Sequence, residues 1–222
     1  MKQVADRFVI ESARHRYSYN FSWMGRPIIQ YPQDIVALQE IIWKTRPSAI
    51  IETGVAHGGS LIFYASMLEL LRGDGIVIGI DIDIRPHNRV EIESHPLSNR
   101  IRLVLGSSTD EMTLKSVRDR LEERGPVMVV LDSNHTAKHV FRELELYSGF
   151  VAAGSYLVVL DTIVERFPPD LVNDRPWEPG NSPMTAVDQF LMESDRFEVD
   201  NEYDRKLLIS MAPRGYLRCV KN

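Results

Sequence analysis

The sequence has few cysteines, no basic excess and no long apolar runs, and each of these absences excludes certain kinds of site or partner. It has a single cysteine, Cys219, which excludes an internal disulfide framework and any cysteine-rich zinc site. It has no excess of basic residues, because 26 lysines and arginines stand against 31 aspartates and glutamates, a formal net charge of −5. A surface that binds nucleic acid or an anionic membrane needs a basic excess, so no nucleic-acid partner is expected.

Long apolar runs are also missing. No stretch reaches membrane-spanning length, and the first residues mix charges instead of showing the basic-then-apolar pattern of a signal peptide. We therefore expect a cytoplasmic protein with no membrane span. The length of 222 residues suits one domain with a real core. We predict a single domain over residues 1–222, with a helical and aromatic extension at 1–33 and the core of the domain at 34–222.

Apolar runs alternate with helical patterns through the middle of the chain. The five runs predicted as strands are Ala49–Ile51, Ile76–Ile80, Ile101–Leu105, Val127–Leu131 and Tyr156–Leu160. Continuous apolar strands between amphipathic helices predict an α/β fold, a doubly wound and mostly parallel sheet covered on both faces. Three later runs joined by short turns predict an antiparallel C-terminal edge: Phe197–Val199, Leu207–Met211 and Tyr216–Val220.

Two other segments carry local predictions. Asp34 precedes apolar residues at helical spacing, so it is predicted to cap a helix that Pro47 ends. Residues 164–183 contain five prolines and form the longest irregular stretch, and a loop of that length is usually functional or mobile.

The segment from Glu52 to Ser60 joins the first strand to its helix and contains Gly54, Gly58 and Gly59. Glycines let a ligand approach the backbone closely, and the start of a helix offers free N–H donors. A dinucleotide site would need Gly-x-Gly-x-x-Gly, which this loop lacks. The carboxylate of Glu52 would repel a phosphate and attract a cationic sulfonium. The loop therefore favours S-adenosylmethionine over NAD, and a glycine turn that merely closes the unit is the alternative.

The ends of the second and third strands extend this site. Asp81 follows Gly59 by roughly the 20 residues at which an acidic residue reaches a ribose hydroxyl, a role for which Asp83 competes. Ser107, after the third strand, is placed to touch the adenine edge, although a plain turn is an equal alternative.

The fourth and fifth strands end in Asp132 and Asp161, and His135 follows the first of these. Neighbouring strands lie about 4.8 Å apart, so both carboxylates could reach one hard cation if these strands are adjacent. A histidine nearby could take a proton from a substrate hydroxyl, because its ordinary pKa lies near neutral pH. Asp132 is also expected to contact the methyl donor. The alternative is that both aspartates cap turns and His135 is an ordinary surface residue.

These residues together resemble the cephalosporin hydroxylase/rhamnosyl O-methyltransferase family, from about Trp23 to Val220. The segments that carry the resemblance are Pro27–Pro32, Ile51–Gly54, Gly58–Ser60, Leu131–His135, Gly154–Val159 and Pro213–Leu217. The resemblance implies an S-adenosylmethionine-dependent O-methyltransferase with a seven-stranded Rossmann-like sheet, oligomeric assembly and often a magnesium ion.

The resemblance also assigns roles at the reacting side. It implies that Asp132 and Asp161 are metal ligands, and that His135 falls where catechol-type O-methyltransferases carry a basic residue. The family usually has an acidic residue immediately before the second aspartate, and this chain has Leu160 there. Loss of that carboxylate should weaken magnesium binding, because charge count sets affinity in such sites.

We therefore predict transfer of a methyl group to a hydroxyl of a sugar or glycosylated natural product, with His135 as general base, magnesium as a possible aid, and a homo-oligomeric assembly. One alternative is an NAD-dependent oxidoreductase. The other is a non-catalytic adenosylmethionine-binding protein, whose biological activity would survive replacement of His135.

Overall fold

The computed structural model describes residues 1–222, and a seven-stranded sheet forms its centre. The strands are β3 (Ala49–Thr53), β4 (Ile76–Asp81), β5 (Ile101–Leu105), β6 (Val127–Leu131), β7 (Tyr156–Val159), β8 (Phe197–Val199) and β9 (Tyr216–Cys219). Their order across the sheet is β5-β4-β3-β6-β7-β9-β8. The first five run parallel, and β9 pairs antiparallel with both β7 and β8. The predicted sheet and its antiparallel edge are confirmed.

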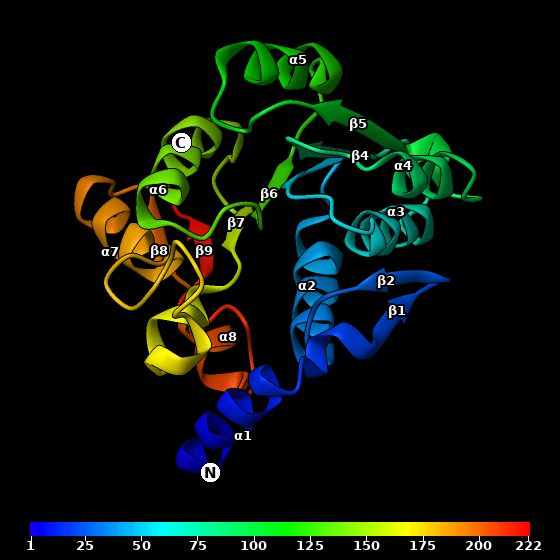
Figure 1. Ribbon diagram of the computed structural model, residues 1–222. Helices are drawn as coiled ribbons and strands as arrows, with labels where there is room; N and C mark the ends of the chain where they lie inside the picture. The colour runs from blue at the N-terminus through cyan, green and yellow to red at the C-terminus, as the bar shows by residue number, and fades with distance from the viewer.

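Helices cover both faces of this sheet (Figure 1). The α-helices of the chain are α1 (Lys2–Arg14), which lies away from the sheet, α2 (Pro32–Thr45), α3 (Gly59–Leu70), α4 (Pro86–Glu93), α5 (Glu111–Leu121), α6 (Ala137–Tyr147), α7 (Pro183–Glu193) and α8 (Asn201–Lys206). Successive strand residues point to opposite faces, so Ile50 packs in the core with α2 and α3, whereas Ile51 packs in the core with α5 and α6. The inner parallel strands β3, β4, β6 and β7 thus contribute to two cores, which explains their apolar runs.

The N-terminal segment forms a small unit of its own before α2. After α1 and a 3₁₀ turn at Tyr17–Asn20, β1 (Phe21–Trp23) and β2 (Arg26–Ile28) make a hairpin that was not predicted. Trp23 fixes this hairpin on α3, since its Nε1 donates to Oγ of Ser66 at 3.0 Å and its ring meets Phe63 edge-on. The hairpin therefore lies next to the loop that begins α3.

Asp34 does not cap α2, which starts at Pro32. The Asp34 carboxylate is fully buried and accepts hydrogen bonds from Ser210 Oγ, the Met211 backbone N–H and the Tyr216 hydroxyl at 2.6 to 2.7 Å. Burial raises the pKa of Asp34 to about 6. The same contacts explain why the predicted strand at Leu207–Met211 is wrong: the N–H of Met211 is taken by a carboxylate, and no strand forms there.

The proline-rich stretch at residues 164–183 contains only short 3₁₀ turns, at Thr162–Arg166 and Pro169–Leu171. Glu165 ties its two ends together by accepting from the Gly180 N–H, Ser182 Oγ and Thr185 Oγ1. Ser182 caps α7, a helix that was not predicted. No helix in the chain combines the length and the apolar character needed to cross a membrane.

Candidate active site

The carboxyl ends of the parallel strands meet along one edge of the sheet, and the chain departs in opposite directions from β3 and β6. In sheets of this kind ligands bind at such a switch point. Thr53, at the end of β3, pairs with Leu131 at the end of β6, which places Gly54 beside Asp132. The predicted strand-end residues therefore converge.

The glycine loop between β3 and α3 is packed too tightly for larger residues. Gly54 has a φ of +94°, and a Cβ there would lie 2.0 Å from the carbonyl oxygen of Asp132. A Cβ on Gly59 would lie 2.1 Å from the carbonyl oxygen of Pro27, and one on Gly58 would collide with a side chain of α4. These glycines thus let the loop pack closely against β6, β2 and α4. The fold itself therefore requires them, whether or not a ligand binds.

Two residues from distant elements hold this loop. Arg26 donates through Nε and Nη2 to the carbonyl oxygen of His57, at 3.0 and 2.7 Å, and through Nη2 to Oδ1 of Asn88 at 3.0 Å. Asn88, which is buried, donates in turn to the carbonyl oxygen of Ala56 at 2.9 Å. Sequence reasoning missed both, because nothing local marks an arginine of a hairpin and an asparagine of α4 as partners.

Asp81, at the end of β4, also supports the loop. Its Oδ2 accepts from the backbone N–H groups of Val55 and Ala56 at 2.8 and 3.3 Å, and its Oδ1 accepts from the N–H of Asp83. Asp83 itself is exposed. Asp81 and Ser107 line the same cavity, which has a volume of about 350 Å³.

Glu52 lies beneath the loop and not at its surface. Its side chain is fully buried, lines neither cavity beside the loop, and accepts a 2.6 Å hydrogen bond from Ser60 Oγ. Its other oxygen has no hydrogen-bond partner. Burial therefore raises the pKa of Glu52 to about 8. The expected direct attraction between this carboxylate and a sulfonium does not fit this position; Glu52 instead orients Ser60.

A second cavity, of about 190 Å³, lies on the other side of Gly54. Gly59, Ser60 and the buried side chain of Gln30 line it, whereas Gly58 does not. Neither polar atom of the Gln30 amide has a hydrogen-bond partner. The two cavities share Gly54, Ala56 and Asp132 in their walls, so they form neighbouring compartments around Asp132.

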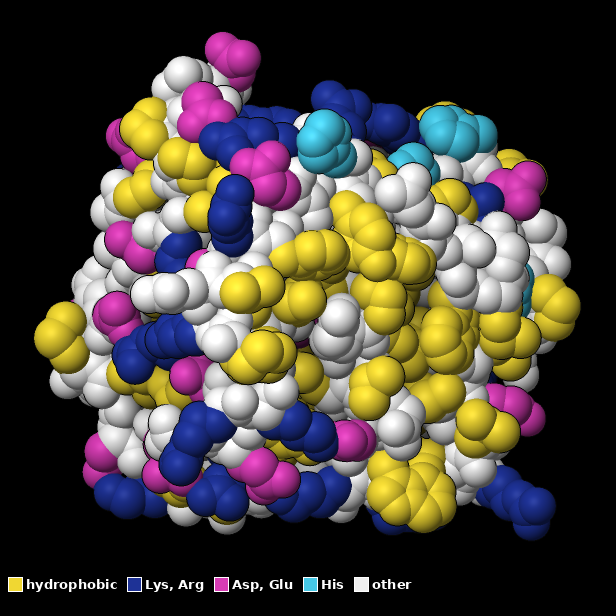
Figure 2. Space-filling model, turned by 90° about the horizontal axis from the view of Figure 1, so that it is seen from below, with side chains coloured by type: hydrophobic (Ala, Val, Ile, Leu, Met, Phe, Trp, Pro, Cys, Tyr) yellow, Lys and Arg dark blue, Asp and Glu magenta, His cyan; other side chains and the backbone are white.

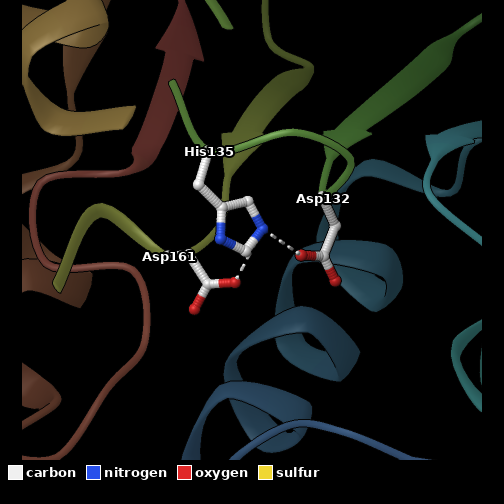
Figure 3. A group of neighbouring side chains, drawn as sticks. All are labelled: Asp132, His135 and Asp161. Carbon is white, nitrogen blue, oxygen red and sulfur yellow. Dashed lines mark ion pairs between the residues drawn. The ribbon is translucent and has the colours of Figure 1, made fainter. Parts of the chain in front are cut away.

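Asp132, His135 and Asp161 come together at the end of the second cavity, as Figure 3 shows. Nε2 of His135 lies 3.1 Å from Oδ2 of Asp161 and 3.8 Å from Oδ1 of Asp132. Packing against protein atoms, and then the charge of Asp161, raise the pKa of Asp132 well above its ordinary value. Two facing carboxylates favour a positive charge between them, which an imidazolium or a cation would supply.

The same three residues offer ligand atoms that all lie within 4.8 Å of one another. Leu160, by contrast, is 3% exposed and packs in the apolar core with β7 and α2. The chain therefore offers two carboxylates and one imidazole to a cation. The two carboxylates suit a hard divalent ion that keeps several waters, and the group contains no third carboxylate that would raise its affinity.

A third cavity, of about 440 Å³, opens beyond His135 and Asp161. The proline-rich stretch and the N-terminal segment line it through residues that include Tyr19, Tyr31, Phe167 and Trp177. Trp177 also lines the 350 Å³ cavity, and its ring lies 4.8 Å from that of His135. Sequence reasoning marked the proline-rich stretch as functional or mobile and did not single out Trp177.

Comparisons with known proteins bear on the family and the fold of the chain. The family model described as Rhamnosyl O-methyltransferase/CmcI matches residues 15–220. The rhamnosyl O-methyltransferase of Mycobacterium bovis is 28% identical over 216 residues, covering 91% of this chain and 82% of the relative. That of Mycobacterium leprae is 27% identical, covering 91% and 87%. A solved structure of CmcI with Mg and SAM is 23% identical, with a TM-score of 0.63 over 91% of this chain and 77% of that one.

Proposed function

Because the chain belongs to the rhamnosyl O-methyltransferase/CmcI family, we propose that it methylates a hydroxyl group of a sugar or a glycosylated natural product. The family gives the coarse activity, that of an S-adenosylmethionine-dependent O-methyltransferase. One observation carries the finer proposal: Asp132 and His135 stand where two compartments around the glycine loop meet the cavity beyond Asp161.

The two compartments around Gly54 suit the two halves of the donor. The adenosine half would lie in the 350 Å³ cavity, where Asp81 and Ser107 offer polar atoms to the ribose and the adenine edge. The methionyl half would lie in the 190 Å³ cavity, against Gly59 and Ser60. The sulfonium would then sit near Asp132, the one acidic residue that the two compartments share, with its methyl group directed to His135.

His135 would act as the general base. An acceptor hydroxyl in the third cavity would lose its proton to the imidazole, whose Nε2 faces Asp161 and Asp132. The two carboxylates would stabilise the imidazolium that forms, as charge-assisted hydrogen bonds do in a site with little water. Placement of donor and acceptor in line supplies much of the remaining acceleration.

Asp132 and Asp161 fit a magnesium ion, as the CmcI structure with Mg and SAM suggests by analogy of fold. Such an ion would supply Lewis-acid activation of the acceptor hydroxyl. His135, which lies beside both carboxylates, would still take the proton of that hydroxyl. With Leu160 in place of a third carboxylate, we expect the ion to be held weakly.

Calorimetric titration with S-adenosylhomocysteine tests the donor site, and NAD serves as the comparison ligand. We expect heat of binding with S-adenosylhomocysteine and none with NAD. Binding of NAD without binding of S-adenosylhomocysteine would reverse the assignment and favour an oxidoreductase.

A homo-oligomer is part of the proposal. Figure 2 shows apolar side chains gathered on the face seen from below, the side where Figure 1 places α1 and the β1–β2 hairpin. Exposed apolar side chains on these elements and on α2 include Val4, Phe8, Met24, Val36 and Trp43. Exposed apolar area of this kind marks interaction surfaces. Analytical ultracentrifugation should find an assembly of more than one chain, and a monomer at all concentrations would reject this part.

A further inference from the structure

The 440 Å³ cavity beyond His135 is lined by several arginines. Three arginines line it, Arg14, Arg16 and Arg175, although the whole chain is acidic with a net charge of −5. Two aspartates line it as well, Asp161 and Asp170. Which of these charges are already neutralised decides what the cavity can bind.

Asp161 and Asp170 are both engaged. Asp161 faces His135, and Asp170 accepts from Nε and Nη2 of Arg14 at 3.1 and 2.8 Å. Arg14 also pairs with Glu11. These contacts tie α1 to the proline-rich stretch, and they leave Arg14 without spare charge.

Arg16 and Arg175 have no such partners. Neither side chain makes an ion pair or a hydrogen bond, and Asp174, which precedes Arg175, does not pair with it. Both are exposed, so no packing demand explains them. The guanidinium of Arg175 lies 5.4 Å from the ring centre of Trp177, which in turn packs on His135. Unpaired positive charge thus flanks the place where the acceptor hydroxyl would react.

We propose that the acceptor carries an oxyanion, a carboxylate or a phosphate, and that Arg16 and Arg175 bind this group while the hydroxyl reaches His135. The inference rests on the proposed function, because it takes this cavity as the acceptor side. Guanidinium groups present forked N–H donors that match the oxygens of such groups. The aromatic rings of Trp177 and Tyr19 line the space between, where they suit the apolar face of a sugar.

A matched pair of probes tests the charge preference: p-nitrophenyl β-D-glucuronide and p-nitrophenyl β-D-glucoside, which differ by one carboxylate. Each is titrated into protein saturated with S-adenosylhomocysteine. We expect the glucuronide to bind about tenfold more tightly, since exposed charge-assisted contacts are individually modest. Raising the salt concentration should shrink the difference. Glucose 6-phosphate against glucose distinguishes phosphate from carboxylate as the preferred group.

The variant Arg16→Gln/Arg175→Gln should bind both glycosides of the pair equally. Arg72→Gln, which removes an exposed and equally unpaired arginine outside the cavity, should keep the wild-type preference. Equal binding of charged and neutral probes by the wild-type protein, or no binding of any probe, would overturn the inference even if S-adenosylhomocysteine binds. Failure of S-adenosylhomocysteine itself to bind would instead reject the proposed function.

Discussion

Nε2 of His135 lies 3.1 Å from Oδ2 of Asp161, although the two residues follow different strands and are brought together only by the pairing of β6 with β7. The side chains are 19% and 17% exposed, so the contact is partly shielded from water. A carboxylate at this distance holds the imidazole in a fixed orientation. The pair therefore has the properties of a base and the residue that positions it.

Replacement of His135 by alanine should lower turnover by a factor of about 10² to 10⁴, the usual contribution of general-base catalysis. The affinity for S-adenosylhomocysteine should change little, because Gly59 and Ser60, against which the methionyl half would lie, stay in place and His135 only lines the same cavity. Methyl transfer from labelled donor and calorimetry measure the two quantities. His87→Ala, at an exposed position, serves as the control. Wild-type biological activity in His135→Ala would instead support a non-catalytic adenosylmethionine-binding protein.

Asp132 and Asp161 should determine whether the protein binds a divalent ion. Titration of Mg²⁺ into the S-adenosylhomocysteine complex should show weak binding, and Asp161→Asn should reduce it by about tenfold or more, because one of two carboxylates is lost. Asp174→Asn, an exposed carboxylate nearby, should change nothing. A chelator should then lower turnover and leave donor binding intact. Full turnover in the chelator would mean that His135 works without a cation.

Glu52 should make the stability of the protein depend on pH. Burial raises its pKa from 4.5 to about 8, so the folded protein holds this proton more tightly than the unfolded chain does. Its contribution is fully present below about pH 4.5 and is lost as the pH rises to about 8. The loss is on the order of 5 kcal/mol at most.

Glu52→Gln keeps the shape of the side chain and removes its titration. Between pH 5 and pH 8, roughly, the free energy of unfolding should therefore fall more for the wild type than for Glu52→Gln. Denaturant unfolding at both pH values measures this difference. Asp34, whose pKa is raised to about 6, contributes in the same direction in both proteins and cancels in the comparison. Parallel pH profiles would show that Glu52 is ionised in the folded protein.

Much of the fold follows from local pattern. The inner parallel strands β3, β4, β6 and β7 could be predicted because they are buried on both faces, so their residues form continuous apolar runs, whereas the edge strand β5 keeps an apolar pattern despite Arg102. The meeting of Asp132, His135 and Asp161 followed from that arrangement, because neighbouring parallel strands end at one edge. The sequence can thus predict which residues come together when their position depends only on the strand that they follow.

The predictions from sequence were wrong or incomplete where a residue forms hydrogen bonds with a partner far away in the chain. Asp34 fits the rule for a helix cap, yet it pairs with Ser210 and Met211, more than 170 residues away. Arg26 and Asn88 hold the glycine loop across 31 and 32 residues, and no local signal marks them. Glu52 precedes the glycines as expected, but only the structure reveals that its side chain is buried and lines neither cavity beside the loop.

Two features require glycine at position 54: the positive φ and the lack of space for a Cβ. A comparison with Gly154 separates their effects. Both Gly54 and Gly154 have positive φ, +94° and +88°, but a Cβ on Gly154 would meet nothing within 4 Å. Alanine at either position should cost about 1 to 2 kcal/mol for the left-handed backbone. Only at Gly54 does the Cβ also overlap the carbonyl oxygen of Asp132, 2.0 Å away, so that β3 and β6 must move apart at the site.

Gly54→Ala should therefore lose both thermal stability and affinity for S-adenosylhomocysteine, whereas Gly154→Ala should lose stability alone. Thermal unfolding and calorimetry on the two purified variants measure the two effects. If Gly54→Ala binds S-adenosylhomocysteine as tightly as the wild type, the loop tolerates displacement from Asp132. The donor compartments on either side of Gly54 would then not be the place where the methyl donor binds, since a shift of the shared wall must change both of them.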